Sequence, residues 1–274
     1  DTLTGGSGAD TLDGGAGIDT ADYSGSATGV SIDLDAGTAS GGDATGDTLT
    51  SIENVTGSSV ADSLTGDGSA NTLVGGGGAD TISGGAGDDQ LEGGSGWDDL
   101  SGGDGADTIS GGSGGDTITG GAGDDIIDGG GDVDTAVFTG NAVDYSIEQN
   151  ADNSITVTDL RDGTSDGSDT VSNVENFRFA DGDLTTAQLL DQNISNVTDT
   201  DAASNTISES ATAGTQVGIT VSAVDPNATD TVTYTVDDNR FEVAGDGVVT
   251  VATGATFDYE TETSIDLTVT ATSS

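Results

Sequence analysis

A single aliphatic residue returns every nine positions through the middle of the chain, with polar residues on both sides of it. Each lies at the centre of a three-residue segment such as TIS or QLE, between stretches rich in glycine. One inward-facing side chain between two outward-facing ones is typical of a short β-strand, and glycine-rich stretches form tight turns because glycine accepts positive φ. The pattern therefore predicts an all-β fold. The predicted core column is Ile82, Leu91, Leu100, Ile109, Ile118 and Ile127.

Two nine-residue units are expected to form one coil of a parallel solenoid, with coils stacked about 4.8 Å apart. One coil cannot bury its own aliphatic residue, so the array is stable only when coils stack and their ends are covered. Seven copies of the unit begin at Gly75, Gly84, Gly93, Gly102, Gly111, Gly120 and Gly129. Two more begin at Gly5 and Gly14, and two degenerate copies begin at Gly57 and Gly66.

Each complete copy ends its glycine-rich half with an aspartate. The predicted columns are Asp80, Asp98 and Asp116 at one edge, and Asp89, Asp107, Asp125 and Asp134 at the other. Like charges about 5 Å apart repel strongly where little water lies between them, and a divalent cation removes this repulsion. Calcium fits because it takes six to eight oxygen ligands, whereas magnesium demands a near-ideal octahedron. Zinc is disfavoured because the chain has no His and no Cys.

These units resemble the repeats-in-toxin (RTX) nonapeptide, GGxGxDxUx, which binds calcium. The resemblance implies a parallel β-roll, type I secretion and an extracellular location where the chain folds on meeting calcium. Two copies depart from the motif and are expected to be weak or altered: Asn71 occupies one ligand position, and Asp132 replaces the fourth glycine of the last copy. The calcium ligands that the resemblance implies are Asp10, Asp19, Asp80, Asp89, Asp98, Asp107, Asp116, Asp125 and Asp134.

The charge of the chain narrows its possible partners. It has 50 acidic and 3 basic residues and a formal net charge of −47, so without cations we expect self-repulsion to keep much of it expanded. A chain without a basic patch is not expected to bind nucleic acid or an anionic membrane, and no apolar run approaches the ~20 residues of a spanning helix. Without cysteine, metal must replace disulfides in stabilising the fold.

An enzymatic function is not expected. Serine–histidine, cysteine–histidine and zinc–histidine chemistry all need residues that the chain lacks. A carboxylate pair for glycoside hydrolysis is conceivable, but the acids lie at periodic ligand positions. Aromatic residues make up 4% of the chain, and the sequence indicates no aromatic-lined cleft.

The region before residue 190 contains an internal duplication. The phrases GIDTADYSG and DVDTAVFTG leave the two arrays, and DTLTSIENV from Asp47 and DTVSNVENF from Asp169 return to them. We therefore divide it into N-terminal repeats with a β-rich excursion (1–56), the main β-roll (57–134) and a β-rich cap (135–190). A hairpin is expected over residues 144–160, and the cap is expected to cover the solenoid end with Val174, Phe177 and Phe179.

From residue 195 to 274, alternating β-branched residues predict a β-sandwich. The segment resembles a bacterial cadherin-like domain. The resemblance implies calcium ligands at Glu209, Asp225, Asp258 and Glu260, although Asn227 and Tyr259 depart from the family's motifs. An immunoglobulin-like sandwich with incidental surface acids is the alternative. The family continues into one more edge strand, so we expect either an excerpt of a longer polypeptide or a strand supplied by another chain through β-augmentation.

These features predict a calcium-stiffened segment of a bacterial surface adhesin or extracellular fibre, such as one in a biofilm matrix, in which subunits could donate strands to one another. An S-layer subunit, or the non-catalytic export region of an RTX enzyme, is the alternative. The expected partners are calcium, further copies of the chain and surface glycans. A sugar could stack on Trp97, the one tryptophan of the chain.

Overall fold

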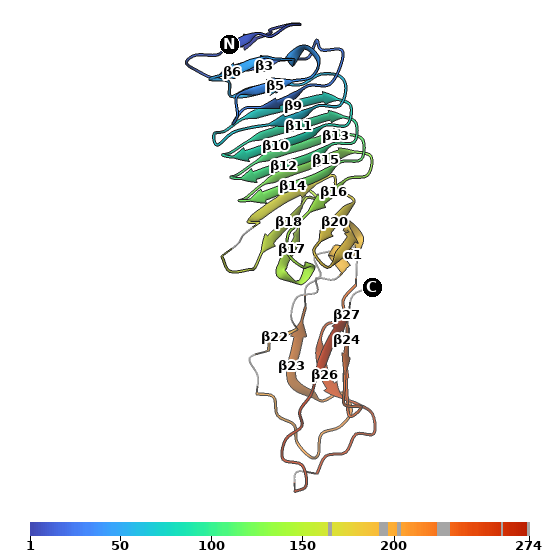
Figure 1. Cartoon of the computed structure of the whole chain (residues 1–274). Coiled ribbons are helices and arrows are strands. Elements are labelled where there is room, and N and C mark those ends of the chain that lie inside the picture. The colour runs from blue at the N-terminus through green and yellow to red at the C-terminus, as the bar shows by residue number, and fades with distance from the viewer. Residues whose placement is uncertain (164–165, 192–196, 202–203, 224–230, 259, 273–274) are drawn as a thin grey trace. The chain divides into compact units, whose positions relative to one another are not determined.

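The computed structural model describes residues 1–163, 166–191, 197–201, 204–223, 231–258 and 260–272. The chain divides into two compact units, Asp1–Leu189 and Leu190–Ser274. The first unit is an all-β parallel solenoid of about eight turns (Figure 1). The described residues contain one α-helix, α1 (Thr186–Asp191), and two 3-10 helices, η1 (Gly42–Ala44) and η2 (Ala142–Asp144).

Two sheets form the walls of the solenoid. In spatial order, the first sheet contains β1 (Thr2–Leu3), β3 (Thr20–Asp22), β7 (Asn54–Thr56), β9 (Thr72–Gly77), β11 (Gln90–Ser95), β13 (Thr108–Ser113), β15 (Ile126–Gly131), β19 (Ser168–Ser172), β18 (Ile155–Asp159) and β17 (Tyr145–Gln149). The second contains β2 (Thr11–Asp13), β6 (Thr48–Thr50), β5 (Thr38–Ser40), β4 (Ser31–Asp33), β8 (Ser63–Thr65), β10 (Thr81–Ala86), β12 (Asp99–Asp104), β14 (Thr117–Ala122), β16 (Thr135–Val137), β20 (Asn176–Phe179) and β21 (Gly182–Thr185). Because successive strands alternate between the sheets, two nine-residue units make one coil.

The parallel register repeats every eighteen residues, as the nine-residue period predicts. Ile82 pairs with Leu100 in the second sheet, and Leu91 pairs with Ile109 in the first. The aliphatic column is buried throughout, with each of its side chains at most 2% exposed: Ile82, Leu91, Leu100, Ile109, Ile118 and Ile127. Burial of one such side chain stabilises the fold by about 1.5–3 kcal/mol, and each coil contributes only two.

Aromatic side chains cover the end of the main array. Ala136 continues the column after Ile118, and Phe177 follows it in the register. The ring of Phe138 lies 5.5 Å from that of Tyr145 and 6.2 Å from that of Phe177. This supplies the apolar cover that a solenoid end needs.

The two excursions are built mainly from antiparallel pairs. β17 and β18 form the expected hairpin, and Asn153 takes a positive φ of 71° in its turn. In the N-terminal excursion, β4 pairs antiparallel with β5 and parallel with β8. The N-terminal excursion therefore joins the stack at the coil that contains the first degenerate copy.

The second unit contains two small antiparallel sheets. One has the order β22 (Thr198–Asp199), β23 (Gln216–Ser222), β26 (Val248–Val251) and β25 (Phe241–Val243), and the other pairs β24 (Thr233–Val236) with β27 (Val269–Thr272). Val217, Phe241, Val249 and Val251 form a buried cluster, and Val236 and Val269 of the smaller sheet pack against it. Both sheets thus share one core. The cadherin-like assignment of this unit stays a prediction.

Backbone packing at the turns gives a testable consequence. A β-carbon at Gly96, whose φ is +144°, would lie 1.4 Å from the carbonyl oxygen of Gly78 in the preceding coil. Gly96→Ala should therefore lower the free energy of unfolding by about 2–4 kcal/mol, as measured by urea denaturation in calcium. Gly68→Ala is the control, because a β-carbon there meets no atom within 4 Å, and its effect should stay within about 0.5 kcal/mol. Equal effects of the two variants would contradict the stacking of the turns.

Candidate metal centre

The motif aspartates close the turns of the solenoid, and all of them except the half-buried Asp10 are buried there. Those of the main array are each at most 2% exposed: Asp80, Asp89, Asp98, Asp107, Asp116, Asp125 and Asp134. In each of these side chains, Oδ1 accepts a backbone N–H from the neighbouring coil, eighteen residues earlier. The Asp80 N–H donates to Asp98 Oδ1 at 2.8 Å, and the Asp89 N–H donates to Asp107 Oδ1 at 2.8 Å. These bonds fix the register of the coils at two edges.

One aspartate lies in a different column from the one expected. The Asp116 N–H donates to Asp134 Oδ1 at 2.8 Å, so Asp134 belongs to the column of Asp80, Asp98 and Asp116. The assignment of Asp134 to the other edge was wrong because each column advances by eighteen residues, and Asp134 lies eighteen residues after Asp116. Asp125 is followed in its own column by Asp169, whose Oδ1 accepts the Asp125 N–H at 2.9 Å.

The second oxygen of each motif carboxylate is the unusual feature of these turns. Among the described residues, nine buried side-chain oxygens have no hydrogen-bond partner, and they are the Oδ2 atoms of Asp10, Asp19, Asp80, Asp89, Asp98, Asp107, Asp116, Asp125 and Asp134. These are the nine positions at which the motif places its ligands. A buried polar atom without a partner costs about 1–3 kcal/mol, and more when charged. A bound cation would remove that cost.

Oxygen atoms converge beside the first glycine of each unit. A β-carbon at Gly102 would lie 2.1 Å from Asp107 Oδ2 and 2.5 Å from the carbonyl oxygen of Gly120 in the next coil. A β-carbon at Gly111 would likewise lie 2.4 Å from Asp116 Oδ2 and 2.6 Å from the Gly129 carbonyl oxygen. Carboxylate and carbonyl oxygens of this kind are the ligands that calcium prefers. The residues present therefore fit calcium, and glycine keeps the cradle open.

Burial shifts the titration of these carboxyl groups. Burial raises the pKa of Asp80 from the ordinary 3.8 to about 6, against the lowering effect of its hydrogen bond from the Asp62 N–H, and Asp98 adds repulsion. Burial likewise raises the pKa of Asp89 and of Asp125 to about 6. The same cause raises the pKa of the remaining members: Asp98, Asp107, Asp116 and Asp134. Without a cation, the charged form of each column is therefore disfavoured.

The two degenerate copies fill the same positions with protein hydrogen bonds. Asp62 accepts hydrogen bonds from the backbone N–H and the hydroxyl of Ser58, and from the Val30 N–H at 2.7 Å. Asn71 Nδ2 donates to the Glu53 carbonyl oxygen at 2.8 Å, and its Oδ1 accepts the Asp67 N–H at 2.8 Å. In this coil, protein donors occupy the oxygens that are free elsewhere. This arrangement gives a physical reason for the expected weakness of the copy with Asn71.

Four ligand-like carboxylates lie outside the predicted set. Backbone N–H groups of the last motif aspartates of the two arrays donate to Asp47, Glu53, Asp169 and Glu175. All four belong to the phrases DTLTSIENV and DTVSNVENF. Their duplication was visible in the sequence, but their ligand-like placement was not, because they break the nine-residue period.

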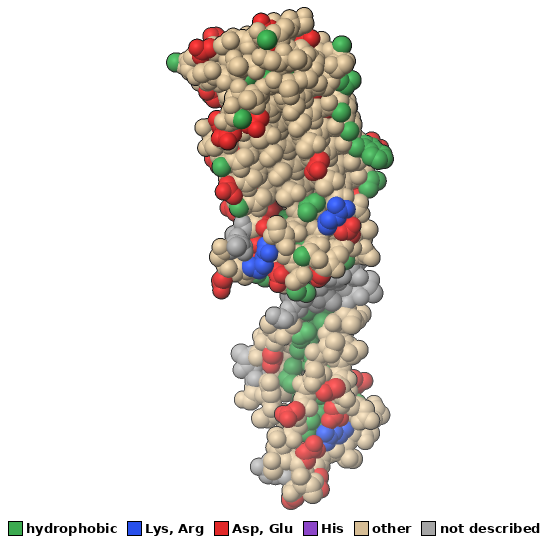
Figure 2. Space-filling model, viewed as in Figure 1, with side chains coloured by type: hydrophobic (Ala, Val, Ile, Leu, Met, Phe, Trp, Pro, Cys, Tyr) green, Lys and Arg blue, Asp and Glu red, His purple; other side chains and the backbone are tan. Residues whose placement is uncertain are grey.

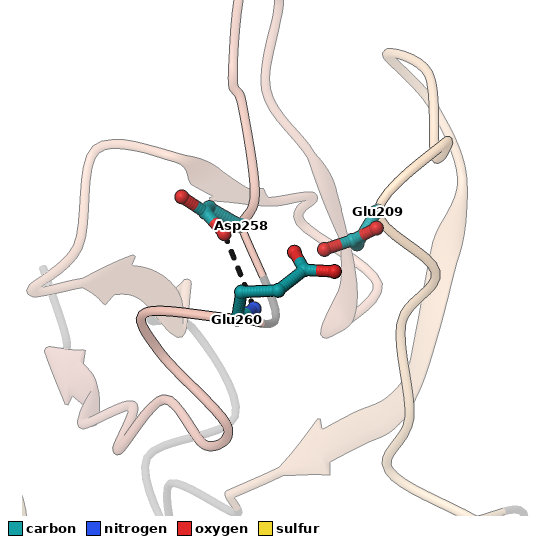
Figure 3. A group of neighbouring side chains, drawn as sticks. All are labelled: Glu209, Asp258 and Glu260. Atoms are coloured by element: carbon teal, nitrogen blue, oxygen red, sulfur yellow. Dashed lines mark hydrogen bonds between the residues drawn. The ribbon is translucent and has the colours of Figure 1, made fainter.

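In the second unit, three of the four predicted acids come together. Glu209, Asp258 and Glu260 each offer a carboxylate oxygen within 4.8 Å of the other two, and all three are exposed (Figure 3). The Glu260 N–H donates to Asp258 Oδ1 at 3.1 Å. The fourth predicted ligand, Asp225, lies outside the described residues, as do Asn227 and Tyr259. Calcium binding by this cluster stays a prediction.

Charge is distributed unevenly over the surface. Figure 2 shows few acidic side chains over the stacked strands of the β-roll on the face displayed, where uncharged side chains and backbone prevail. The outward positions of these strands hold residues such as Thr81, Ser83 and Thr117, whereas the motif aspartates lie buried in the turns. The strands carry a few acidic side chains of their own, such as Glu92 and Asp99, which are exposed.

The residues that build these turns match a known repeat family. Five stretches of the chain match the model of the RTX calcium-binding nonapeptide repeat (4 copies), namely residues 1–21, 52–82, 65–100, 74–109 and 101–136. No curated protein matches the chain at a significant level. The chain therefore carries RTX calcium-binding repeats in a β-roll, which is a calcium-binding structural region. Within the described residues, no helix has the length and apolar character needed to cross a membrane.

The raised pKa values predict that acid partly replaces calcium. Asp80 takes up its proton near pH 6 in the folded state and near pH 3.8 when unfolded, so the metal-free fold gains stability as the pH falls from about 6 to about 4. In a chelator, the β signal in circular dichroism should be larger at pH 4.5 than at pH 7.5. Calcium affinity should fall over the same range, because the ligands must be deprotonated. An equal recovery on adding sodium chloride at pH 7.5 would instead attribute the effect to general charge screening.

Proposed function

We propose that this chain is a secreted, calcium-stiffened segment of a bacterial surface adhesin or extracellular fibre. The observation that carries the proposal is the set of nine buried carboxylate oxygens without a described protein partner. They lie at two edges of one stack, so ions bound there would tie successive coils together. A rod stiffened in this way suits a protein that presents or links other parts at a cell surface.

Charge connects this role to export. With a formal charge of −47, the metal-free chain repels itself and resists compaction. A chain of this kind leaves the cell unfolded, by type I secretion, and folds where calcium is plentiful. Calcium then contributes stability that disulfides supply in many secreted domains, and this chain has no cysteine.

The region described is proposed to be non-catalytic. The motif carboxylates of the main array each accept a backbone N–H, and turn carbonyl oxygens lie near several of them, as expected of ligands of a bound ion; the chain has neither His nor Cys. If the region belongs to a larger RTX enzyme, it is the part that binds calcium and supports export. An S-layer subunit is the other alternative, and it would assemble into a two-dimensional lattice instead of a fibre.

Two surface features support an adhesive or self-associating role. Trp97 is 78% exposed in its turn, and the equivalent residues of neighbouring coils at that edge, Ala79, Gly115 and Val133, are uncharged. A neutral glycan could stack there. In the second unit, β27 pairs with β24, and no described strand pairs with its other edge. A cavity of about 530 Å³, lined by Ile207, Ile265 and Leu267 among others, could receive the side chains of a donated strand.

Removal of calcium tests the central claim. In a chelator at neutral pH, the circular dichroism β signal of the β-roll should be lost, because the carboxylate columns repel. It should return at roughly 10⁻⁴–10⁻³ M calcium, the range of extracellular sites. Magnesium at the same concentrations is the control and should restore much less. Identical spectra in chelator and in calcium would exclude the proposed calcium-dependent fold.

The assembly state in calcium tests the fibre role. Strand donation predicts filaments in electron micrographs and a concentration-dependent mass in sedimentation velocity. Ile265→Asp should prevent assembly by placing a charge in the cavity, whereas Thr212→Asp adds the same charge at an exposed position outside β27 and outside the cavity lining and should leave assembly unchanged. A monomer at all concentrations would rule out strand donation, and two-dimensional lattices would favour the S-layer alternative.

A further inference from the structure

In both RTX arrays, no further repeat follows the last two motif aspartates. Inside an array, each motif aspartate donates its backbone N–H to the carboxylate of the aspartate eighteen residues later. Asp10 and Asp19 end the first array, and Asp125 and Asp134 end the second, so no motif aspartate lies eighteen residues beyond any of them. Their Oδ2 atoms are nevertheless among the buried oxygens without a described partner.

The phrase DTVSNVENF supplies carboxylates for both columns of the second array. The Asp125 N–H donates to Asp169 Oδ1 at 2.9 Å, and the Asp134 N–H donates to Glu175 Oε2 at 3.0 Å. Within the array the corresponding distances are 2.8 Å. The two acids therefore take the positions of the next motif aspartates, although 44 and 41 residues separate them from their donors.

Carbonyl oxygens continue the cradle in the same way. A β-carbon at Gly129 would lie 2.2 Å from the Asn173 carbonyl oxygen and 2.8 Å from Asp134 Oδ2. At Gly111, inside the array, the carbonyl oxygen in this position belongs to Gly129. Asn173 has a φ of 51°, a left-handed conformation that glycine usually supplies and that asparagine tolerates better than most residues. The strained backbone at Asn173 thus keeps a carbonyl oxygen at the end of the column.

The first array ends with the same device. The Asp10 N–H donates to Asp47 Oδ1 at 2.8 Å, and the Asp19 N–H donates to Glu53 Oε2 at 2.9 Å. A β-carbon at Gly14 would lie 2.1 Å from the carbonyl oxygen of Ser51, which has a φ of 53°. Ser51 and Asn173 each stand two residues before the glutamate of their phrase. Two separate parts of the chain therefore build the same end.

The choice of glutamate follows from the spacing. The aspartate and glutamate of each phrase lie six residues apart, whereas successive aspartates of the array lie nine apart. The connection is three residues shorter, so the backbone before the second carboxylate takes a tighter path. Glutamate has one more methylene group than aspartate, and its carboxylate reaches the N–H of the last aspartate from this path.

We propose that carboxylates of the two return phrases are calcium ligands that close the columns of the arrays. The ligands are Glu53 for the first array, and Asp169 and Glu175 for the second. Asp47 is not included, because both of its oxygens accept protein hydrogen bonds, from the Asp10 N–H and from the Tyr23 hydroxyl. This inference rests on the proposed calcium binding of the repeats. The motif aspartates that these ligands follow, Asp19, Asp125 and Asp134, are at most 2% exposed, and each carries an unpartnered Oδ2.

Local charges favour a cation at the second end. Asp169 is 2% exposed, and its Oδ1 accepts the backbone N–H of another buried acidic residue, Asp125. The nearby guanidinium of Arg161 pairs with Asp159 at 2.7 Å and with Asp166 at 3.3 Å, and no ion pair of the described residues involves Asp169. Calcium at this position would connect the β-roll directly to β19 and β20 of the cap.

Calcium stoichiometry of the full chain tests the proposal. Asp169→Asn and Glu175→Gln should each lower the number of bound ions, measured by elemental analysis after gel filtration at saturating calcium. Glu148→Gln is the matched control, because this acid of the same cap is exposed on β17; it should leave the number unchanged. Circular dichroism of each variant in calcium reports whether the array is folded.

Hydrogen exchange of the wild-type chain gives a second readout that needs no variant. Protection of residues 168–179 should appear over the same calcium range as that of the array, residues 81–131. If these residues are equally protected in chelator, or if both variants bind as many ions as the wild type, the inference is wrong while the proposed function stands. A wild-type chain that binds no calcium would overturn both.

Discussion

The carboxylate of each motif aspartate does two things that the rest of the β-roll depends on. In the main array its Oδ1 atom holds the register of neighbouring coils through a backbone N–H, and its Oδ2 atom is buried without a described protein donor. The hydrogen bonds of the Oδ1 atoms bring carboxylates of like charge together along the stack. The Oδ2 atoms carry that charge without a protein group to compensate it. Since each coil buries only two aliphatic side chains of the column, apolar packing alone does little to offset this repulsion. The fold and the need for a cation are therefore the same property of the turn.

The array is not uniform in this respect. In the coil of Asp62 and Asn71, side-chain and backbone groups of the protein bind the oxygens that are unpartnered elsewhere. This coil lies between the N-terminal repeats and the main array and also pairs with β4 and β7. Protein hydrogen bonds thus stabilise this coil where its neighbours have unpartnered carboxylate oxygens. Within one continuous stack, the degenerate repeats thus use protein hydrogen bonds at the positions where the other repeats leave carboxylate oxygens unpartnered.

Much of the first unit could be predicted from the sequence because its core and turn residues recur at a fixed period. One aliphatic residue and one aspartate in nine specify the core column, the alternation of two sheets and the buried carboxylates. The column of Asp134 was assigned wrongly although the eighteen-residue step determines it. Asp169 and Glu175 escaped notice because a 44-residue excursion separates Asp169 from its donor, and a search for a fixed period cannot cross such an excursion. In the second unit, the resemblance pointed to Glu209, Asp258 and Glu260, whose carboxylates lie together, while the sequence of this unit has no fixed period from which its strand boundaries could be predicted.

Calcium in the columns would still leave a strongly acidic protein. The nine motif aspartates with unpartnered oxygens are a minority of the 50 acidic residues, so neutralising them removes local repulsion and preserves the overall field. A surface of this charge repels anionic polymers and anionic membranes. Contacts with such surroundings must therefore be made through uncharged parts of the molecule. Among the described residues, the turn edge around Trp97 and the edge of β27 that pairs with no described strand have this character, and backbone pairing needs no charge complementarity.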